Sequence, residues 1–282
     1  MNQYNTIGFH PGNSRIHQLN ATVKLLFLLV VSISAMVTYD TRYLILISVS
    51  SILLFKYAHI EWKQVRFVVK FILFFTILNI IAVYIFDPEY GVKIYNQRTE
   101  LINGIGRFTL TSQELFYLFN LILKYISTVP LALIFLFTTN PSHFAASLNQ
   151  LGVNYKISYA VSLALRYIPD IQETYFNISQ AQQARGYDNS KKAKFTSRVK
   201  GIKRIVLPLI FSSIERIDTI STAMELRQFG QYKRRTWYVK KQLKKDDYVV
   251  LCLTLILLML VVTLFFLNNS RYFNPWHQYS YK

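Results

Sequence analysis

Residues 248–267 read YVVLCLTLILLMLVVTLFFL, and these twenty residues contain no charged side chain. A membrane-spanning helix needs about 20 predominantly apolar residues, so this run predicts one crossing. Working towards the N-terminus, four more apolar runs cover residues 115–137, 67–86, 43–55 and 23–37. The sequence therefore predicts an all-α, polytopic membrane protein with about five transmembrane helices.

The composition supports a membrane protein and argues against several other classes. Of 282 residues, 52% are apolar and 16% charged, with a formal net charge of +18. A nucleic-acid-binding protein would share this charge but not the long uncharged runs, so we expect a lipid bilayer and no nucleic acid as partner. The single cysteine, Cys252, excludes an intrachain disulfide framework and a zinc cluster built on cysteines. Residues 1–20 lack the apolar core of a secretory signal peptide.

The distribution of basic residues predicts the orientation. Residues 138–247 hold 19 of the 32 Lys and Arg residues, whereas the link at 87–114 is mixed in charge. Because cytoplasmic links carry an excess of Lys and Arg, we expect the N-terminus and the long basic segment inside and the C-terminus outside. Three parts result: an N-terminal membrane domain with four transmembrane helices (1–138), cytoplasmic coupling helices (139–247), and the last transmembrane helix with an external tail (248–282).

The long basic segment shows helical periodicity. Ile171, Tyr175 and Ile178 follow one another at steps of four and three, and a second series runs from Ile210 to Met224. This spacing predicts two amphipathic helices, which Pro169 and Pro208 start or kink. The basic run between them, residues 191–204, is typical of a solvated segment beside anionic lipid.

Both predicted helices end in a similar way. The first ends Gln183-Ala184-Arg185-Gly186, and the second ends Glu225-Leu226-Arg227-Gln228-Phe229-Gly230. One interpretation is simple capping, since glycine commonly follows a helix and a cation suits the helix dipole in the last turn. The other is that each Arg presents a planar fork to an acidic groove on a partner.

Two lysines lie within the predicted spans. Lys24, at the start of the first span, is expected to snorkel towards the interface. Lys124 lies centrally in the fourth span, upstream of Pro130. A basic residue at that depth usually has a functional or paired role, and snorkelling is the alternative.

Four stretches together resemble the transmembrane T component of energy-coupling factor (ECF) transporters, the EcfT/CbiQ family of prokaryotic vitamin and metal importers. They are Ser14-Arg15-Ile16-His17-Gln18-Leu19 followed by Lys24; Thr138-Thr139-Asn140-Pro141 with Leu148, Leu151, Gly152 and Val153; Arg166-Tyr167-Ile168-Pro169 leading to Ala184-Arg185-Gly186; and Ala223-Met224-Glu225-Leu226-Arg227-Gln228.

The resemblance implies a non-catalytic scaffold in a prokaryotic cell membrane. A T component joins two cytoplasmic ATP-binding cassette ATPase subunits to a small membrane substrate-binding (S) subunit. The motifs Ala184-Arg185-Gly186 and Leu226-Arg227-Gln228 would couple to the ATPases. The second motif departs from the family's Ala-Arg-Gly and keeps the Arg alone, which predicts a looser fit. Lys124 stands where the family tends to have Arg.

The chain itself has no G-x-x-x-x-G-K-[ST] phosphate loop, so we expect neither ATP nor another cofactor on it. The main alternative is an ATP-independent membrane transporter or channel, which would need ionisable residues along a path and often has inverted repeats. An intramembrane enzyme would need acids or histidines gathered within spans. A membrane anchor that binds lipid or nucleic acid would explain the charge but not the paired helix ends.

Overall fold

The computed structural model describes residues 12, 14–102, 108–187, 195–232, 236–239 and 241–276, with the backbone alone at 102 and 195–200. The basic residues Lys191, Lys192 and Lys194 and part of the run at 233–245 lie outside the described residues. The described helices and strands are α1 (Arg15–Gln18), α2 (Ala21–Val37), α3 (Thr41–Tyr57), α4 (Trp62–Phe86), α5 (Tyr90–Tyr95), β1 (Glu100–Ile102), β2 (Leu110–Thr111), α6 (Ser112–Thr138), α7 (Pro141–Gln150), α8 (Tyr155–Ala184), α9 (Phe195–Leu226) and α10 (Lys245–Leu267).

Most of these helices begin at a side chain that caps the first turn. In five helices, the oxygen of the preceding Asn, Asp or Thr accepts a hydrogen bond from a backbone N–H two or three residues further along the chain, where the helix has no partner of its own. The capping residues are Asn20, Asp40, Thr111, Asn140 and Asn154. The sequence thus marks where these helices start.

The chain divides into two compact units. One, the crossed-helix unit, contains Asn140–Lys240 with α7, α8 and α9, and the other, the bundle, contains His10–Thr139 and Lys241–Lys282. The bundle holds α2, α3, α4, α6 and α10, so every apolar run singled out in the sequence is a helix. Pro130, Pro169 and Pro208 all lie inside helices.

The prediction of an all-α, multi-pass membrane protein is confirmed. The 25-residue α4, the 27-residue α6 and the 23-residue α10 are long and apolar enough to cross a membrane. The helices α2 and α3 have 17 residues each, which is about 25 Å at the rise of an α-helix. That length is at the lower end of what a crossing needs.

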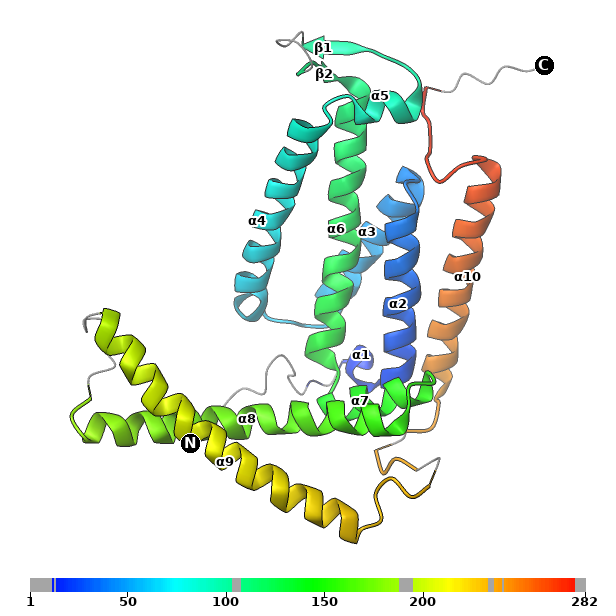
Figure 1. Ribbon diagram of the computed structural model, residues 1–282. Helices are drawn as coiled ribbons and strands as arrows, with labels where there is room; N and C mark the ends of the chain where they lie inside the picture. The colour runs from blue at the N-terminus through cyan, green and yellow to red at the C-terminus, as the bar shows by residue number, and fades with distance from the viewer. Residues whose placement is uncertain are drawn as a thin grey trace. The chain divides into compact units, whose positions relative to one another are not determined.

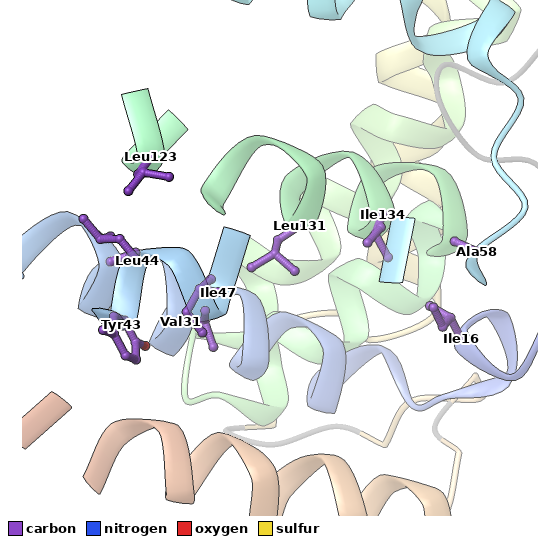
Figure 2. Close-up of a cluster of buried hydrophobic side chains, with 10 residues drawn as sticks. Ile16, Val31, Tyr43, Leu44, Ile47, Ala58, Leu123, Leu131 and Ile134 are labelled. Carbon is purple, nitrogen blue, oxygen red and sulfur yellow. The ribbon is translucent and has the colours of Figure 1, made fainter. Parts of the chain in front are cut away.

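Helix α6 lies in the centre of the bundle and packs against α2, α3 and α4, while α10 packs on α2 (Figure 1). Figure 2 shows the core, where Leu44 and Ile47 of α3 lie near Val31 of α2 in one cluster with Leu123, Leu131 and Ile134 of α6. Small polar side chains tighten the α3–α6 contact, since the hydroxyls of Ser48 and Ser127 lie 2.8 Å apart. Small residues of this kind let membrane helices approach closely.

One end of the bundle is closed by the segment that follows α10. The N–H of Tyr39, between α2 and α3, donates to the carbonyl of Arg271 at 2.7 Å, and Asn274 donates to the carbonyl of Tyr95 in α5. Gly91 in α5 approaches α6 so closely that a Cβ would lie 2.5 Å from the Gln113 carbonyl oxygen. The α2–α3 link, α5 and the C-terminal segment therefore share one end, as an alternating five-span path requires.

Candidate functional site

The first candidate tip is the end of α8. Arg185 is the C-cap, and Gly186 follows in the left-handed region at φ +83°. The N–H of Gly186 donates to the Gln183 carbonyl at 2.9 Å, and the N–H of Tyr187 donates to the Gln182 carbonyl at 3.2 Å. These two bonds define a Schellman motif.

The second tip, at the end of α9, has the same backbone turn. Arg227 occupies the C-cap position, and Gln228 adopts the left-handed conformation at φ +55°. The N–H of Gln228 donates to the Glu225 carbonyl at 2.8 Å, and that of Phe229 donates to the Met224 carbonyl at 2.9 Å. The left-handed conformation costs a residue with a Cβ roughly 1–2 kcal/mol, a cost that glycine avoids. The turn at the end of α9 therefore forms despite this cost.

Both arginine side chains are exposed. Neither Arg185 nor Arg227 makes an ion pair or a side-chain hydrogen bond with another residue in the described parts of the chain. Leu226, beside the second arginine, is 81% exposed. Each tip therefore displays a guanidinium with its five N–H donors available to a partner.

An aromatic residue two positions after each arginine holds the tip against the other long helix. Tyr187 stacks under the guanidinium of Arg204 in α9, at 3.7 Å from the ring centroid. Phe229 packs against two rings at the start of α8, with centroids 5.7 Å from Tyr155 and 4.7 Å from Tyr159. The repeated pattern Arg-x-aromatic, at 185–187 and 227–229, is the sequence signal that could have identified these anchors.

The same contacts show that α8 and α9 cross in antiparallel fashion, as Figure 1 also shows. The end of α9 meets the start of α8, so the two arginines lie at opposite ends of the crossed pair. With 30 residues, α8 is about 45 Å long. One folded unit thus presents two equivalent tips far enough apart to reach two separate partners.

Between the tips, the crossed helices leave apolar surface exposed. A groove of about 320 Å³ is lined by both helices. An ion pair between Arg216 of α9 and Asp170 of α8 (3.3 Å) connects the two helices. The groove is lined by residues that include Leu163, Tyr167, Ile171, Leu209, Ile217 and Ile220. Outside it, Phe211 is 62% exposed, together with Ile210 and Ile214. The predicted amphipathic faces exist, and part of their apolar surface is uncovered.

Comparison with known proteins identifies the family. A family model described as CbiQ, cobalt transport protein, matches residues 12–238. The chain belongs to the CbiQ family. It is 26% identical over 236 residues to the energy-coupling factor transporter transmembrane protein EcfT of Streptococcus equi subsp. equi, covering 81% of this chain and 84% of the relative. The protein of the same name from Bacillus subtilis is 26% identical over 244 residues, covering 82% and 86%.

A shorter stretch is more similar still. The EcfT protein of Limosilactobacillus fermentum is 37% identical over 83 residues, which is 29% of this chain and 31% of that relative. The CbiQ match confirms the family resemblance suggested by the four sequence motifs.

In this CbiQ-family chain, Lys124 has a structural partner. The residue is 5% exposed, and its Nζ donates to the carbonyl oxygen of Met36 at 2.6 Å and lies 3.2 Å from the centroid of the Tyr39 ring. Met36 is in the last turn of α2, where carbonyls have no partner within the helix. The Lys124 ammonium is therefore bonded to the C-terminal end of a neighbouring helix.

The environment of Lys24 differs from the expected snorkelling. Lys24 does not snorkel: its Nζ is buried and donates to the carbonyl of Thr138 at 3.0 Å and to its Oγ1 at 3.2 Å. Thr138 is the last residue of α6. The α2–α6 pair therefore exchanges two lysines, each binding the C-terminal carbonyls of the other helix, where a cation is favoured by the helix dipole. Among the described residues, no three His, Cys, Asp or Glu side chains gather into a metal-binding cluster.

Proposed function

We propose that this CbiQ-family chain is the non-catalytic T component of an ECF-type importer for a vitamin or a metal ion. It would transmit the movement of two ATP-binding cassette subunits to a small membrane substrate-binding (S) subunit. The observation that carries this proposal is the pair of equivalent turns at Arg185 and Arg227.

Each tip would dock one ATPase subunit. The guanidinium at each tip is exposed and has no partner among the described residues, so an acidic or carbonyl-lined groove can accept it without breaking an internal contact. The flanking residues Ala184, Gly186, Leu226 and Gln228 would contact the rim of the groove. Because the tips lie at opposite ends of α8 and α9, the two ATPases can bind at the same time.

The apolar surface between the tips would contact the S subunit. The groove between α8 and α9 and the exposed Phe211 provide uncovered apolar area within a unit that is otherwise basic. Contiguous apolar surface of this kind marks a protein or membrane interface. Movement imposed at the tips would reach the S subunit through the same two helices.

The orientation follows from charge. We place the crossed-helix unit and the N-terminus in the cytoplasm because the segment 138–247 holds 19 of 32 basic residues. At the end of the bundle that carries α5, Lys93 pairs with Asp87 at 2.8 Å and Arg98 with Glu100 at 2.9 Å. The link at 87–114 holds only three of the 32 Lys and Arg residues, which favours the external side for that end and for the C-terminus.

A transporter that works without ATP is less well supported. It would need ionisable groups along a path, whereas Lys124 is bound to the Met36 carbonyl and to the Tyr39 ring. That arrangement joins helices and leaves the lysine poorly placed for a passing ion.

Copurification tests the proposal. The affinity-tagged chain, expressed together with the proteins encoded beside it, should retain two ATP-binding cassette subunits. Arg185→Ala and Arg227→Ala should each weaken that retention. Arg166→Ala is the matched control, because Arg166 is exposed in the middle of α8, away from both tips. A wild-type chain that retains no ATPase subunit would refute the proposal.

A further inference from the structure

The path of the chain between the two units points to residues that could transmit movement in addition to the two arginine tips. The chain leaves the bundle after Thr139 and returns to it at Lys241, with the crossed-helix unit in between. Both the outgoing and the returning segment are bonded to the first turn of α2, through three buried side chains: Asn20, Lys24 and Asp247. We call these three residues the junction clamp.

Lys24 holds the outgoing segment. Its ammonium binds the carbonyl and the hydroxyl of Thr138 at 3.0 and 3.2 Å and the carbonyl of His17 at 3.4 Å. An ammonium has three N–H donors, and this geometry gives each of them an acceptor. Since Lys24 is 8% exposed and Thr138 is 2% exposed, water does not readily replace these bonds.

Asn20 and Asp247 hold the returning segment. The Asn20 side chain donates to the Lys241 carbonyl at 3.1 Å, while its backbone N–H donates to Asp247 at 2.8 Å. The second oxygen of Asp247 accepts from the N–H of Lys244 at 2.8 Å and so starts α10. Asn20 also caps α2 through its own side-chain oxygen. One asparagine therefore ties the start of α2 to the segment that enters α10.

We propose that the junction clamp is the connection through which movement of the crossed-helix unit is passed to α2 and so to the membrane bundle. This inference rests on the proposed T-component function. If the two segments separated from α2, a buried ammonium and a buried carboxylate would lose their partners, which is strongly disfavoured. A displacement that pulls on either end of the crossed-helix unit must then move α2 with it. Asn20, Lys24 and Asp247 are thus positioning residues for coupling, and they belong to a different unit from the two arginine tips.

The test compares two lysines that bind in the same way at opposite ends of the same helix pair. Lys24→Met removes the bond to the end of α6, and Lys124→Met removes the equivalent bond to the end of α2. The purified complex with its ATPase and S subunits is reconstituted into liposomes. Substrate uptake and ATP hydrolysis are measured on the same sample, so that uptake per ATP is obtained.

We expect Lys24→Met to assemble with both ATPases and hydrolyse ATP, with uptake per ATP reduced between about twofold and thirtyfold, the range for residues that carry coupling between sites. Lys24→Arg should recover part of it, and Asp247→Asn should show the same defect through a different side chain. Lys124→Met should keep the wild-type ratio.

Two results would overturn the inference. One is a Lys24→Met complex whose uptake per ATP equals that of the wild type or falls no further than that of Lys124→Met. The other is a Lys24→Met chain that does not assemble, which would assign Lys24 to folding. If the wild-type chain itself binds no ATPase subunit, the T-component proposal fails, and that outcome is visible before any ratio is measured.

Discussion

Arg185→Ala separates docking from helix capping at the first tip. The side chain is exposed and has no ion-pair or hydrogen-bond partner among the described residues, so its removal should change the stability of the chain by no more than about 0.5 kcal/mol. The whole effect should therefore fall on the complex. Removing one partner of a buried, hydrogen-bonded charge pair costs about 2–5 kcal/mol, and each 1.4 kcal/mol or so is tenfold in affinity. We expect the variant to bind ATPase at least about tenfold more weakly.

Arg185→Lys distinguishes the two interpretations of the tip. If the guanidinium enters a groove, lysine keeps the charge but loses the planar fork, and the rescue should be partial. If the arginine only interacts with the helix dipole, the loss in Arg185→Ala should stay below about 1 kcal/mol and lysine should substitute fully. Titration of ATPase subunits onto the immobilised chain, with uptake assays in parallel, measures both quantities. An Arg185→Ala variant that transports normally and retains both ATPases would refute the docking role.

The second tip requires a revised expectation. The flanking Leu226 and Gln228 suggest a looser fit for Arg227, and hence a milder effect of Arg227→Ala. The backbone turn, however, matches that of the first tip, and Phe229 anchors it against two tyrosines. The geometry of the chain gives no reason for a difference, so we expect Arg227→Ala to weaken docking as much as Arg185→Ala does.

Three further predictions concern the turn, the bundle and the topology. Gln228→Gly should raise the free energy of unfolding by about 1 kcal/mol because it relieves the left-handed conformation, and an unchanged or lower unfolding midpoint would contradict this. Lys124→Met should lower stability by about 1–3 kcal/mol because the Met36 carbonyl loses its donor, whereas lost transport at unchanged stability would instead place Lys124 on a transport path. In a chain without Cys252, Tyr238→Cys should react with an impermeant thiol reagent from the cytoplasm only and Arg98→Cys from outside only, and labelling of both from one side would disprove the five-span path.

Hydropathy predicted the positions of the bundle helices because each apolar run is continuous in sequence. The run at 43–55 is the shortest, and the structure extends that helix to Thr41–Tyr57. The physical reason for its weak signal is that Ser48 and Ser51 are buried against α6, where their hydroxyls bond to Ser127 and to the Ile126 carbonyl. A serine in such an interface lowers the hydropathy of a helix without weakening its packing.

The long-range contacts of Lys24 and Lys124 could not be predicted from the sequence in the same way. Lys24 and Thr138 are 114 positions apart, and Lys124 and Met36 are 88 apart. No local pattern shows that a lysine will meet the last carbonyls of another helix. The similarity of the two tips was visible in the letters around Arg185 and Arg227, but the left-handed conformation of Gln228 was not, because it contradicts the preference of glutamine.

The placement of charge differs between the bundle and the crossed-helix unit. Inside the bundle, Lys24, Lys124 and Asp247 are all buried, and each is bonded to backbone groups at a helix end. Charges held in this way resist displacement, since moving them would leave buried groups unpaired. In the crossed-helix unit the arrangement is reversed, because Arg185, Arg227 and much apolar surface are exposed. These three charges of the bundle are bonded internally, whereas the exposed arginines at the two tips have no ion-pair or side-chain hydrogen-bond partner among the described residues. The proposed transmission of movement would use both features, the internally bonded charges of the bundle and the unpartnered arginines of the tips.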